Sequence, residues 1–336
     1  MKLDIRARRD MLVTSTQNKE EGMVMERWTE PRRLTLTVEE EQDGQTVDTL
    51  LRRTLRLSGT SVKRVKRAED GIRLDGVPVY VTARAAAGQI LSVLVGDTEG
   101  ETGLTPTPGD LPIVYEDGDL LLLDKPAGRP VHPGPGHFDD TIGNLLTYYY
   151  KKTGQTVKFR PVNRLDRGTS GLMCAAKHAH AHERLKEQLH SSAFRRIYLA
   201  VCDGVPPEEA GTVDAPIGRA EGSLLAREVR PDGAPARTRY QVLGRHQGRS
   251  LLRLELDTGR THQIRVHMAW LGCPLTGDFL YGTEDRALIG RTALHSAGLS
   301  LIHPVTGAPV IRTSLLPADM AALIGPLALE AAGRIW

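Results

Sequence analysis

The pattern of apolar and polar positions divides the chain into segments with helical spacing and segments with strand alternation. In residues 47–57 the apolar side chains recur three or four positions apart, which predicts a helix. Ser61 can cap a second helix, and an Asp-Gly turn at 75–76 separates two short strands. Residues 89–95 alternate as a last strand. Together these elements predict a small α/β module over residues 46–96.

The longer segment 111–336 is rich in hairpin signals. Apolar runs over 113–123 and 237–256 are each interrupted by a short polar turn, which is typical of β-hairpins. Thr141 can cap a helix, and a further helix is expected over 179–189. Because strands and helices do not alternate regularly, the pattern predicts an α+β domain with a mixed, mostly antiparallel sheet and flanking helices.

Two stretches fall outside these domains. Residues 1–45 have mixed charge and little periodicity, so we expect a poorly ordered N-terminal extension. Residues 97–110 are rich in Gly, Pro, Thr and acidic side chains, which is typical of a linker. A flexible linker of this kind predicts that the small module is loosely tethered.

Composition narrows the class of protein. The net charge of +3 and the pI near 8.7 permit a polyanionic partner, whereas 4% aromatic residues argue against extended single-strand binding by many stacked rings. Three cysteines without a Cys-x-x-Cys pair argue against a disulfide framework and a cysteine zinc site. No run of 18 apolar residues and no apolar leader is present. We therefore expect a cytoplasmic protein without a membrane segment, acting as a monomer.

The small module carries a one-sided excess of cations. A charge run is usually a solvent-exposed face that mixes both signs, but here only two acidic residues fall between positions 52 and 73. This excess favours contacts to an RNA phosphate backbone. The candidate RNA-binding residues are Arg52, Arg53, Lys63, Arg64, Lys66 and Arg67.

A dense polar loop, NRLDRGTSG at 163–171, precedes a short apolar strand. Glycines at 168 and 171 allow backbone angles that other residues rarely adopt. Asp166, Thr169 and Ser170 can hydrogen-bond the neighbouring backbone and hold the loop in one shape. Taken alone, Asp166 is interpreted as a structural turn residue.

A second dense stretch, DTGRTHQIRVHM at 257–268, places a glycine loop before a helix. His262 and Arg265 are three residues apart and share one face of that helix. Tyr198 lies within an apolar strand, where a core tyrosine is the plain interpretation. His132 and His137 lie in a proline-rich loop without a third nearby ligand, so we predict no metal site.

Four stretches together resemble the RluA-type pseudouridine synthases: DKPAG at 124–128, NRLDRGTSGL at 163–172, RRIYLAV at 195–201 and TGRTHQIRVHMAWLGCPLTGD at 258–278. The resemblance covers roughly residues 111–320, in the order and spacing of that family. It implies a pseudouridine synthase catalytic domain over 111–336. The two helices, hairpin and basic face of 46–96 resemble the RNA-binding module named after ribosomal protein S-four.

The resemblance implies roles for individual side chains. Asp166 stands at the essential aspartate, Arg265 at the arginine that pairs with it, and Tyr198 at the tyrosine that stacks on the target base. Arg164 is similar to the arginine that fills the gap left by the flipped-out base. The chain departs from the common pattern at Asn163, where many members have histidine. The other candidate RNA contacts are Arg196, which stands where lysine is common, and His262.

The implied reaction fits these residue types. Converting uridine to pseudouridine breaks a nitrogen–carbon bond and forms a carbon–carbon bond without loss of atoms or net electron transfer, so no cofactor is expected. A carboxylate can act as nucleophile or base; attack on the ribose, attack on the base and abstraction of a ribose proton all stay open. The expected partner is large-subunit ribosomal RNA, with transfer RNA as the alternative.

Two other functions compete with an RNA pseudouridine synthase. A non-catalytic RNA-binding or ribosome-assembly protein could keep the same fold, although the full set of Asp166, Tyr198 and Arg265 argues against it. A glycosidase would need a second carboxylate near Asp166, and the sequence offers no credible one.

Overall fold

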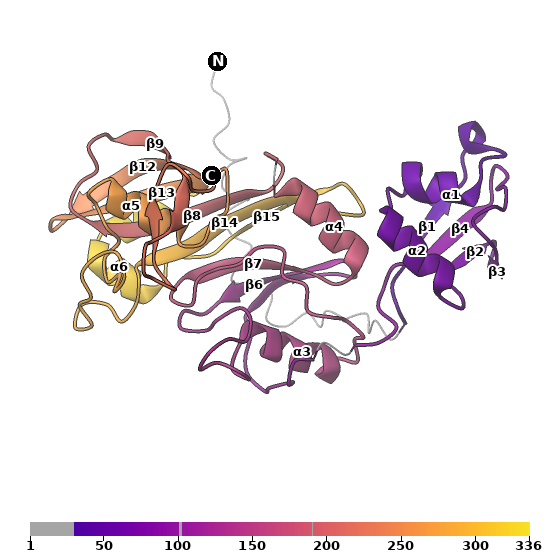
Figure 1. Cartoon of the computed structure of the whole chain (residues 1–336), viewed down its shortest axis with the longest axis horizontal. Coiled ribbons are helices and arrows are strands. Elements are labelled where there is room, and N and C mark those ends of the chain that lie inside the picture. The colour runs from indigo at the N-terminus through magenta and orange to yellow at the C-terminus, as the bar shows by residue number, and fades with distance from the viewer. Residues whose placement is uncertain (1–29, 101–102, 190) are drawn as a thin grey trace, which may run out of the picture.

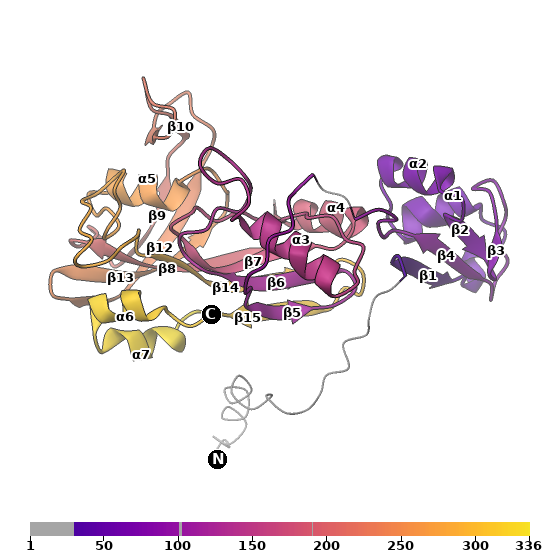
Figure 2. The same ribbon diagram turned by 90° about the horizontal axis from the view of Figure 1, so that it is seen from below.

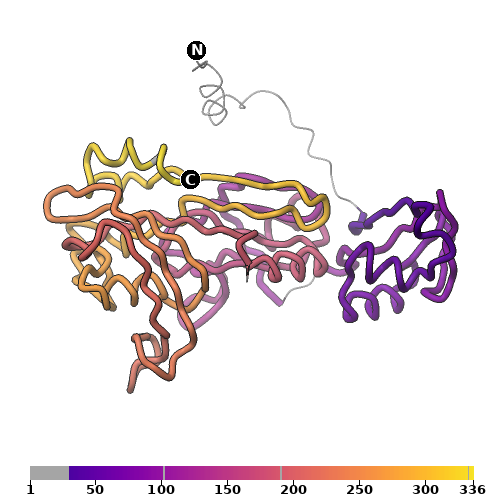
Figure 3. The backbone as a smooth tube through the Cα atoms, turned by 90° about the horizontal axis from the view of Figure 1, so that it is seen from above, coloured from indigo at the N-terminus to yellow at the C-terminus, as the bar shows by residue number. Residues whose placement is uncertain are grey.

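The protein consists of a small N-terminal module and a larger domain, which are joined by an extended segment (Figure 1). We describe a computed structural model, in which residues 30–100, 103–189 and 191–336 are placed. Seen from above, the small module lies beyond one end of the larger domain (Figure 3). Among the described residues, no helix is both long and apolar enough to cross a membrane.

The small module is a four-stranded antiparallel sheet covered by short helices, with strand order β1-β4-β2-β3. Its core is apolar, and Val47, Leu50 and Val62 are fully buried. The hairpin turn at Asp75-Gly76 has positive φ at both residues, as predicted for a tight hairpin. The elements are β1 (Arg33–Thr37), η2 (Glu40–Gln42), α1 (Val47–Thr49), η3 (Leu50–Thr54), α2 (Gly59–Arg67), β2 (Ile72–Leu74), β3 (Val77–Pro78) and β4 (Ile90–Leu94).

Two expectations for this region are wrong. Residues 30–45 are not an extension of the module, because β1 pairs with β4 along its whole length and buries Leu34 in the core. Leu34, Leu36 and Val38 alternate with polar residues, which is a strand signal that the prediction missed. Ser58, and not Ser61, caps α2 by accepting a hydrogen bond from the Ser61 N–H at 3.1 Å. The rest of the expected extension, residues 1–29, lies outside the described residues.

The larger domain has the predicted α+β architecture. A nine-stranded sheet in the described part of the chain runs in the order β5-β6-β7-β14-β8-β13-β12-β9, with β15 paired to β14. All of its pairs are antiparallel except β7 with β14. The strands are β5 (Ile113–Glu116), β6 (Leu120–Lys125), β7 (Ser170–Ala176), β8 (Arg195–Asp203), β9 (Ala210–Asp214), β12 (Arg237–His246), β13 (Arg249–Leu256), β14 (Leu294–Ile302) and β15 (Pro309–Thr313).

Helices cover both faces of this sheet, and the alternation along β8 shows how. Tyr198 and Ala200 point to the face covered by α3 (Ile142–Lys152) and α5 (Gln263–Trp270). The intervening Ile197 and Leu199 pack with α6 (Ala318–Ile324) and α7 (Leu327–Ala332), which lie on the opposite side of the sheet in Figure 2. The fifth helix, α4 (Ala179–Gln188), packs on alternate residues of β6 and β7.

A small hairpin stands apart from this sheet. It is formed by β10 (Ile217–Arg219) and β11 (Arg227–Val229), and Figure 2 shows it projecting away from the domain beyond α5. Neither strand was predicted, because three residues each are too few to show alternation.

The parallel pairing of β7 with β14 places the polar loop 163–169 at the start of a buried strand. Gly171 adopts a φ of +107°, and a Cβ there would lie 2.3 Å from the Ser296 carbonyl oxygen. Only glycine fits this close approach. Gly168, in contrast, has no positive φ, and the nearest atom to an added Cβ would be 3.8 Å away. Of these two glycines, only Gly171 needs the backbone freedom that the sequence analysis expected of both.

The segment between the domains contains no helix or strand in residues 97–100 and 103–110. It is nevertheless anchored. Arg160 of the larger domain donates to both carboxylate oxygens of Asp97, at 2.6 and 2.7 Å, and Arg32 donates to Asp119 at 2.9 Å. The expectation of a loosely tethered module is wrong, because polar side chains on both domains, far apart in sequence, join them.

The contrast between the two loop glycines gives a stability test. Gly171→Ala should destabilise the protein by about 3 kcal/mol, because the added methyl group clashes with β14 and the backbone is strained. The matched change Gly168→Ala should stay within about 0.5 kcal/mol of the parent. Urea unfolding followed by circular dichroism measures both. Equal effects of the two changes would contradict the close β7–β14 approach.

Candidate active site

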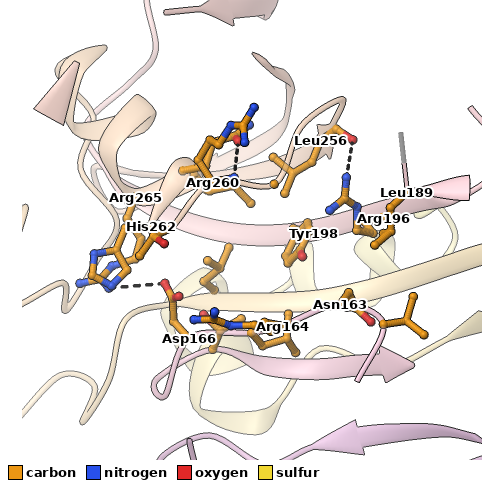
Figure 4. A pocket seen from close by; sticks show the side chains of 18 residues that line it. Asn163, Arg164, Asp166, Leu189, Arg196, Tyr198, Leu256, Arg260, His262 and Arg265 are labelled. Carbon is orange, nitrogen blue, oxygen red and sulfur yellow. Dashed lines mark hydrogen bonds and ion pairs between the residues drawn. The ribbon is translucent and has the colours of Figure 1, made fainter. Parts of the chain in front are cut away.

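A pocket with a volume of about 250 Å³ lies where the loop before β7 meets the start of α5. Figure 4 shows Asp166 and Arg164 on one wall, Arg265 and His262 on a second, and Tyr198 and Arg196 along the strand β8. The remaining lining residues are Val162, Asn163, Leu165, Thr169, Leu189, Leu256, Gly259, Arg260, Thr261, Gln263, Ile264 and Leu294. The three stretches of sequence predicted to act together are therefore adjacent in space.

Hydrogen bonds from within the loop and from neighbouring segments hold the backbone of the Asp166 loop. The Thr169 N–H donates to the Asp166 carbonyl at 3.1 Å and closes the predicted turn. Arg291 donates to the Gly168 carbonyl at 3.3 Å, and Ser170 hydrogen-bonds His295 at 2.9 Å. The backbone of the loop is thus fixed at several points, while the Asp166 side chain is 30% exposed in the pocket.

Lys125, which the sequence analysis included only as part of the DKPAG stretch, supports this site from outside the pocket. Its side chain is completely buried, and Nζ donates to the carbonyls of Pro126, Arg129 and Arg167 at 2.8, 2.9 and 3.3 Å. Burial lowers the pKa of Lys125 to about 7, against the opposing effect of the Asp166 carboxylate. Lys125 joins the 125–129 turn to Arg167, the residue after Asp166, and so fixes the position of the loop that carries Asp166.

Arg265 is held mainly by a carboxylate other than Asp166. Its Nε and Nη2 donate to the two oxygens of Asp278, both at 2.7 Å, and both side chains are almost fully buried. The remaining Nη1 faces Asp166, with 3.5 Å between Nη1 and Oδ2. Burial acts to lower the pKa of Arg265, but the Asp278 carboxylate outweighs it and raises that pKa. A permanent positive charge therefore faces Asp166 in a fixed direction.

Asp278 was missed because its segment, TGDF, has the composition of an ordinary turn. Its carboxylate also accepts the backbone N–H groups of Leu280 and Tyr281, which fixes both the turn and the acid. The Arg265 guanidinium lies 5.0 Å from the centre of the Tyr281 ring, within cation–π range. The signal that could have identified Asp278 is its position inside the stretch that carries the resemblance.

His262 is the N-cap that precedes α5, in the left-handed region at a φ of 59°, so the expectation that it shares a helix face with Arg265 is wrong. Its Nδ1 hydrogen-bonds the Tyr281 hydroxyl at 2.8 Å, and burial lowers the pKa of the imidazole. A neutral His262 at pH 7 has one ring nitrogen bound to Tyr281 and lines the pocket beside Arg265. The positive φ of His262 costs conformational energy, and such strain is concentrated at functional sites.

Tyr198 and Arg196 lie on the same face of β8 and are 5% and 7% exposed. Burial raises the pKa of the Tyr198 hydroxyl, so the side chain is neutral where it lines the pocket. Arg196 Nη2 reaches the carbonyls of Leu256 and Thr258 only at 3.4 and 3.5 Å, and Nε has no hydrogen-bond partner among the described residues. Arg196 thus has donor capacity to spare inside the pocket.

Asn163 and Arg164 behave differently. Asn163 is buried, and its side-chain oxygen accepts the Cys174 N–H at 2.8 Å, so the amide supports the loop as a structural residue. Its Nδ2 has no partner in the described part of the structure. Arg164 is exposed at the pocket rim, beside Asp166 in Figure 4.

The predicted cations of the small module fall into two groups. Arg52, Arg53, Lys63, Lys66 and Arg67 are exposed, and Arg52 pairs with Asp48 one helical turn away. Arg64 is half-buried instead, and its Nη2 donates to the Val95 carbonyl at 2.8 Å. Its side chain faces the junction of the two domains, where the Asp97 carboxylate lies within electrostatic range.

One cluster of metal-type ligands lies far from the pocket. Ligand atoms of Asp117, Asp119 and His303 fall within 4.8 Å of one another. Protein donors already occupy them: His303 bonds Asp117 at 2.8 Å, while Arg32 and His178 each bond Asp119 at 2.9 Å. This network is a structural junction between the domains.

Comparison with known proteins places these features in a family. A family model described as RNA pseudouridylate synthase matches residues 119–270. The chain is 36% identical to the uncharacterized RNA pseudouridine synthase YhcT of Bacillus subtilis, over 86% of this chain and 95% of that protein. It is also 36% identical to ribosomal large subunit pseudouridine synthase D of Escherichia coli, over 87% of this chain and 93% of that protein.

Two solved structures of RNA pseudouridylate synthase domain proteins have a similar fold. Human RNA pseudouridylate synthase domain containing 1 superposes with a TM-score of 0.50 at 27% identity, covering 62% of this chain and 85% of that one. The corresponding human domain containing 4 gives a TM-score of 0.51 at 25% identity, covering 66% and 93%. With Asp166, Tyr198 and Arg265 brought together in one pocket, the α+β sheet and these relatives lead to one conclusion: the chain is a member of the RNA pseudouridine synthase family, of the RluA type.

Proposed function

We propose that this enzyme isomerises specific uridines to pseudouridine in large-subunit ribosomal RNA, with Asp166 as the essential carboxylate. The position of Asp166 carries this assignment. Asp166 is a partly exposed carboxylate on a rigid loop, and it faces Nη1 of Arg265, which Asp278 holds in place. Relatives of this chain are named ribosomal large subunit pseudouridine synthases, which supports the choice of RNA.

The electrostatics of the pocket suit a carboxylate that must react as an anion. The positive charge of Arg265 attracts the Asp166 carboxylate and orients it. Because Asp278 holds Nε and Nη2, one edge of the planar guanidinium, Nη1 of Arg265 cannot swing away from the pocket. Whether the carboxylate attacks the ribose, attacks the base or removes a ribose proton stays open, and all three need the same anion.

The target base must leave its helix to reach Asp166. Flipping a base out of a stack costs a few kcal/mol. In our proposal the base stacks on Tyr198, which returns about 1–3 kcal/mol, and Arg164 at the rim occupies the vacated position. Arg196 and His262 supply hydrogen bonds inside the pocket, where Arg196 Nε is unpaired. No redox change and no loss of atoms accompany the reaction, so we propose that it proceeds without a cofactor.

The exposed cations of α2 extend the RNA-binding surface. Lys63, Lys66 and Arg67 form no ion pair within the described part of the chain, so they are available to phosphates. The alternative, a non-catalytic RNA-binding or ribosome-assembly protein, would bind equally well but would not need the Asp278–Arg265–Asp166 arrangement. A transfer RNA substrate, the monomeric state and the cytoplasmic location stay predictions.

The role of Asp166 is tested by Asp166→Asn. The change keeps the size of the side chain but removes its charge, so pseudouridine formation should fall by at least about 1,000-fold while RNA affinity changes less than about threefold. Tritium release from labelled ribosomal transcripts measures the first quantity, and filter binding measures the second. Activity near the parent level would refute the proposed mechanism.

The role of Asp278 is tested by Asp278→Asn. Loss of the buried charge pair should destabilise the protein by about 3 kcal/mol and lower kcat by about 100-fold, with KM nearly unchanged, because Arg265 loses its orientation. Thermal unfolding and steady-state kinetics below the unfolding temperature separate the two effects. As a control, Asp285→Asn alters an exposed carboxylate that, among the described residues, accepts only nearby backbone N–H groups, and this variant should match the parent. A normal kcat for Asp278→Asn would exclude the positioning role.

The phosphate contacts of α2 are tested by the triple change of Lys63, Lys66 and Arg67 to Gln. RNA affinity should fall, and the slope of log affinity against log salt should become shallower by about 2–3, because each lost phosphate contact contributes close to one. Arg286→Gln removes an exposed arginine that is paired with Glu284 and should leave the slope unchanged. An unchanged slope in the triple variant would remove the module from the RNA-binding surface.

A further inference from the structure

Besides the Arg160–Asp97 and Arg32–Asp119 pairs at the linker, a carboxylate of the larger domain contacts the small module at the start of the basic helix α2. Glu183 of α4 accepts hydrogen bonds from the hydroxyls of Ser58 and Ser61, at 2.9 and 3.0 Å. Ser58 is also the N-cap of α2, and Ser61 is 3% exposed. A carboxylate at this end of a helix is further favoured by the helix dipole.

The same helix α4 leads from this contact to the pocket. Leu189, which follows α4 directly, lines the pocket, and it lies six residues after Glu183. At a rise of 1.5 Å per residue, the two positions are about 9 Å apart along the helix. Lys186, between them, is exposed. In Figure 1, α4 is the helix of the larger domain that lies nearest the module.

The geometry points to Glu183 as a positioning residue: it docks the small module so that the exposed cations of α2, Lys186 and the pocket form one continuous RNA-binding surface. This inference rests on the proposed function. A docked module holds an RNA that spans both domains in a fixed register to Asp166. An undocked module would still bind phosphates, but the linker would spread its positions and lower its effective concentration at the RNA.

RNA substrates of different size distinguish a docking role of Glu183 from a purely structural one. A long, structured RNA that reaches the module should depend on docking, whereas a short stem-loop that fills only the pocket should not. A merely structural role for Glu183 would affect both substrates alike.

The first test compares kinetics of the full-length protein on the two RNAs. Glu183→Ala should raise KM for a long ribosomal RNA fragment by about tenfold, with kcat and all stem-loop parameters unchanged. Ser61→Ala should act in the same direction, and the double variant should be no worse than Glu183→Ala, because both remove the same contact. Glu187→Ala is the matched control, since Glu187 lies on the same helix and pairs only with Arg184 among the described residues.

The second test needs no activity. The native cysteines are buried, so spin labels can be placed selectively at Tyr80→Cys in the module and Ile311→Cys in the larger domain, both exposed positions. Double electron–electron resonance on RNA-free protein should give one narrow distance distribution for the parent and for Glu187→Ala. Glu183→Ala should give a broader one, because the Arg32–Asp119 and Arg160–Asp97 pairs that remain lie at the linker and leave the start of α2 unanchored.

Each outcome is decisive. A narrow distribution in Glu183→Ala, an unchanged KM for the long RNA, or an equal rise of KM for both RNAs would overturn the inference. If the parent protein itself formed no pseudouridine on either RNA, the proposed function would fail, and the distance measurement would still decide whether Glu183 docks the module.

Discussion

The buried ion pair between Asp278 and Arg265 is the constraint on which the site depends. A buried guanidinium is costly unless its donors are satisfied, and Asp278 accepts from two of them, Nε and Nη2, along one edge. The Nη1 group, fixed in direction by this contact, faces the carboxylate of Asp166. The contact between Nη1 and Asp166 Oδ2 is long, at 3.5 Å, so Arg265 does not hold Asp166 in a tight ion pair.

The fold supplies the rigidity that this arrangement needs. Asp166 sits on a loop whose backbone is bonded to a completely buried lysine and to Arg291, and whose strand runs parallel to β14 through a contact that only Gly171 permits. Tyr198 comes from the centre of the sheet, and α5 brings Arg265 over the same face. Three segments far apart in sequence thus contribute rigid parts to one pocket, which is the general requirement for a precise site.

Sequence patterns predicted the part of the structure that local physics determines. Hairpins with Asp-Gly and Gln-Gly turns, the Thr141 cap and the α+β class followed from period and turn chemistry. Asp166 and Arg265 were identified together only through the resemblance, because loop aspartates are usually structural. Long-range partners such as Asp278 and Lys125 could not be predicted from local chemistry, since a turn acid and a hairpin lysine look ordinary until the chain folds. The anchored linker was missed for the same reason: Arg160 and Asp97 are far apart in the sequence.

The central claim is that this chain converts uridine to pseudouridine in large-subunit ribosomal RNA through Asp166. The most direct measurement is nucleotide-resolution pseudouridine mapping of total RNA from cells that carry the gene, lack it, or carry only the Asp166→Asn allele. We expect that at least one pseudouridine of large-subunit ribosomal RNA is lost in cells that lack the gene. It should stay absent in cells that carry only the Asp166→Asn allele. Retention of every pseudouridine in cells without the gene, or full restoration by Asp166→Asn, would contradict it.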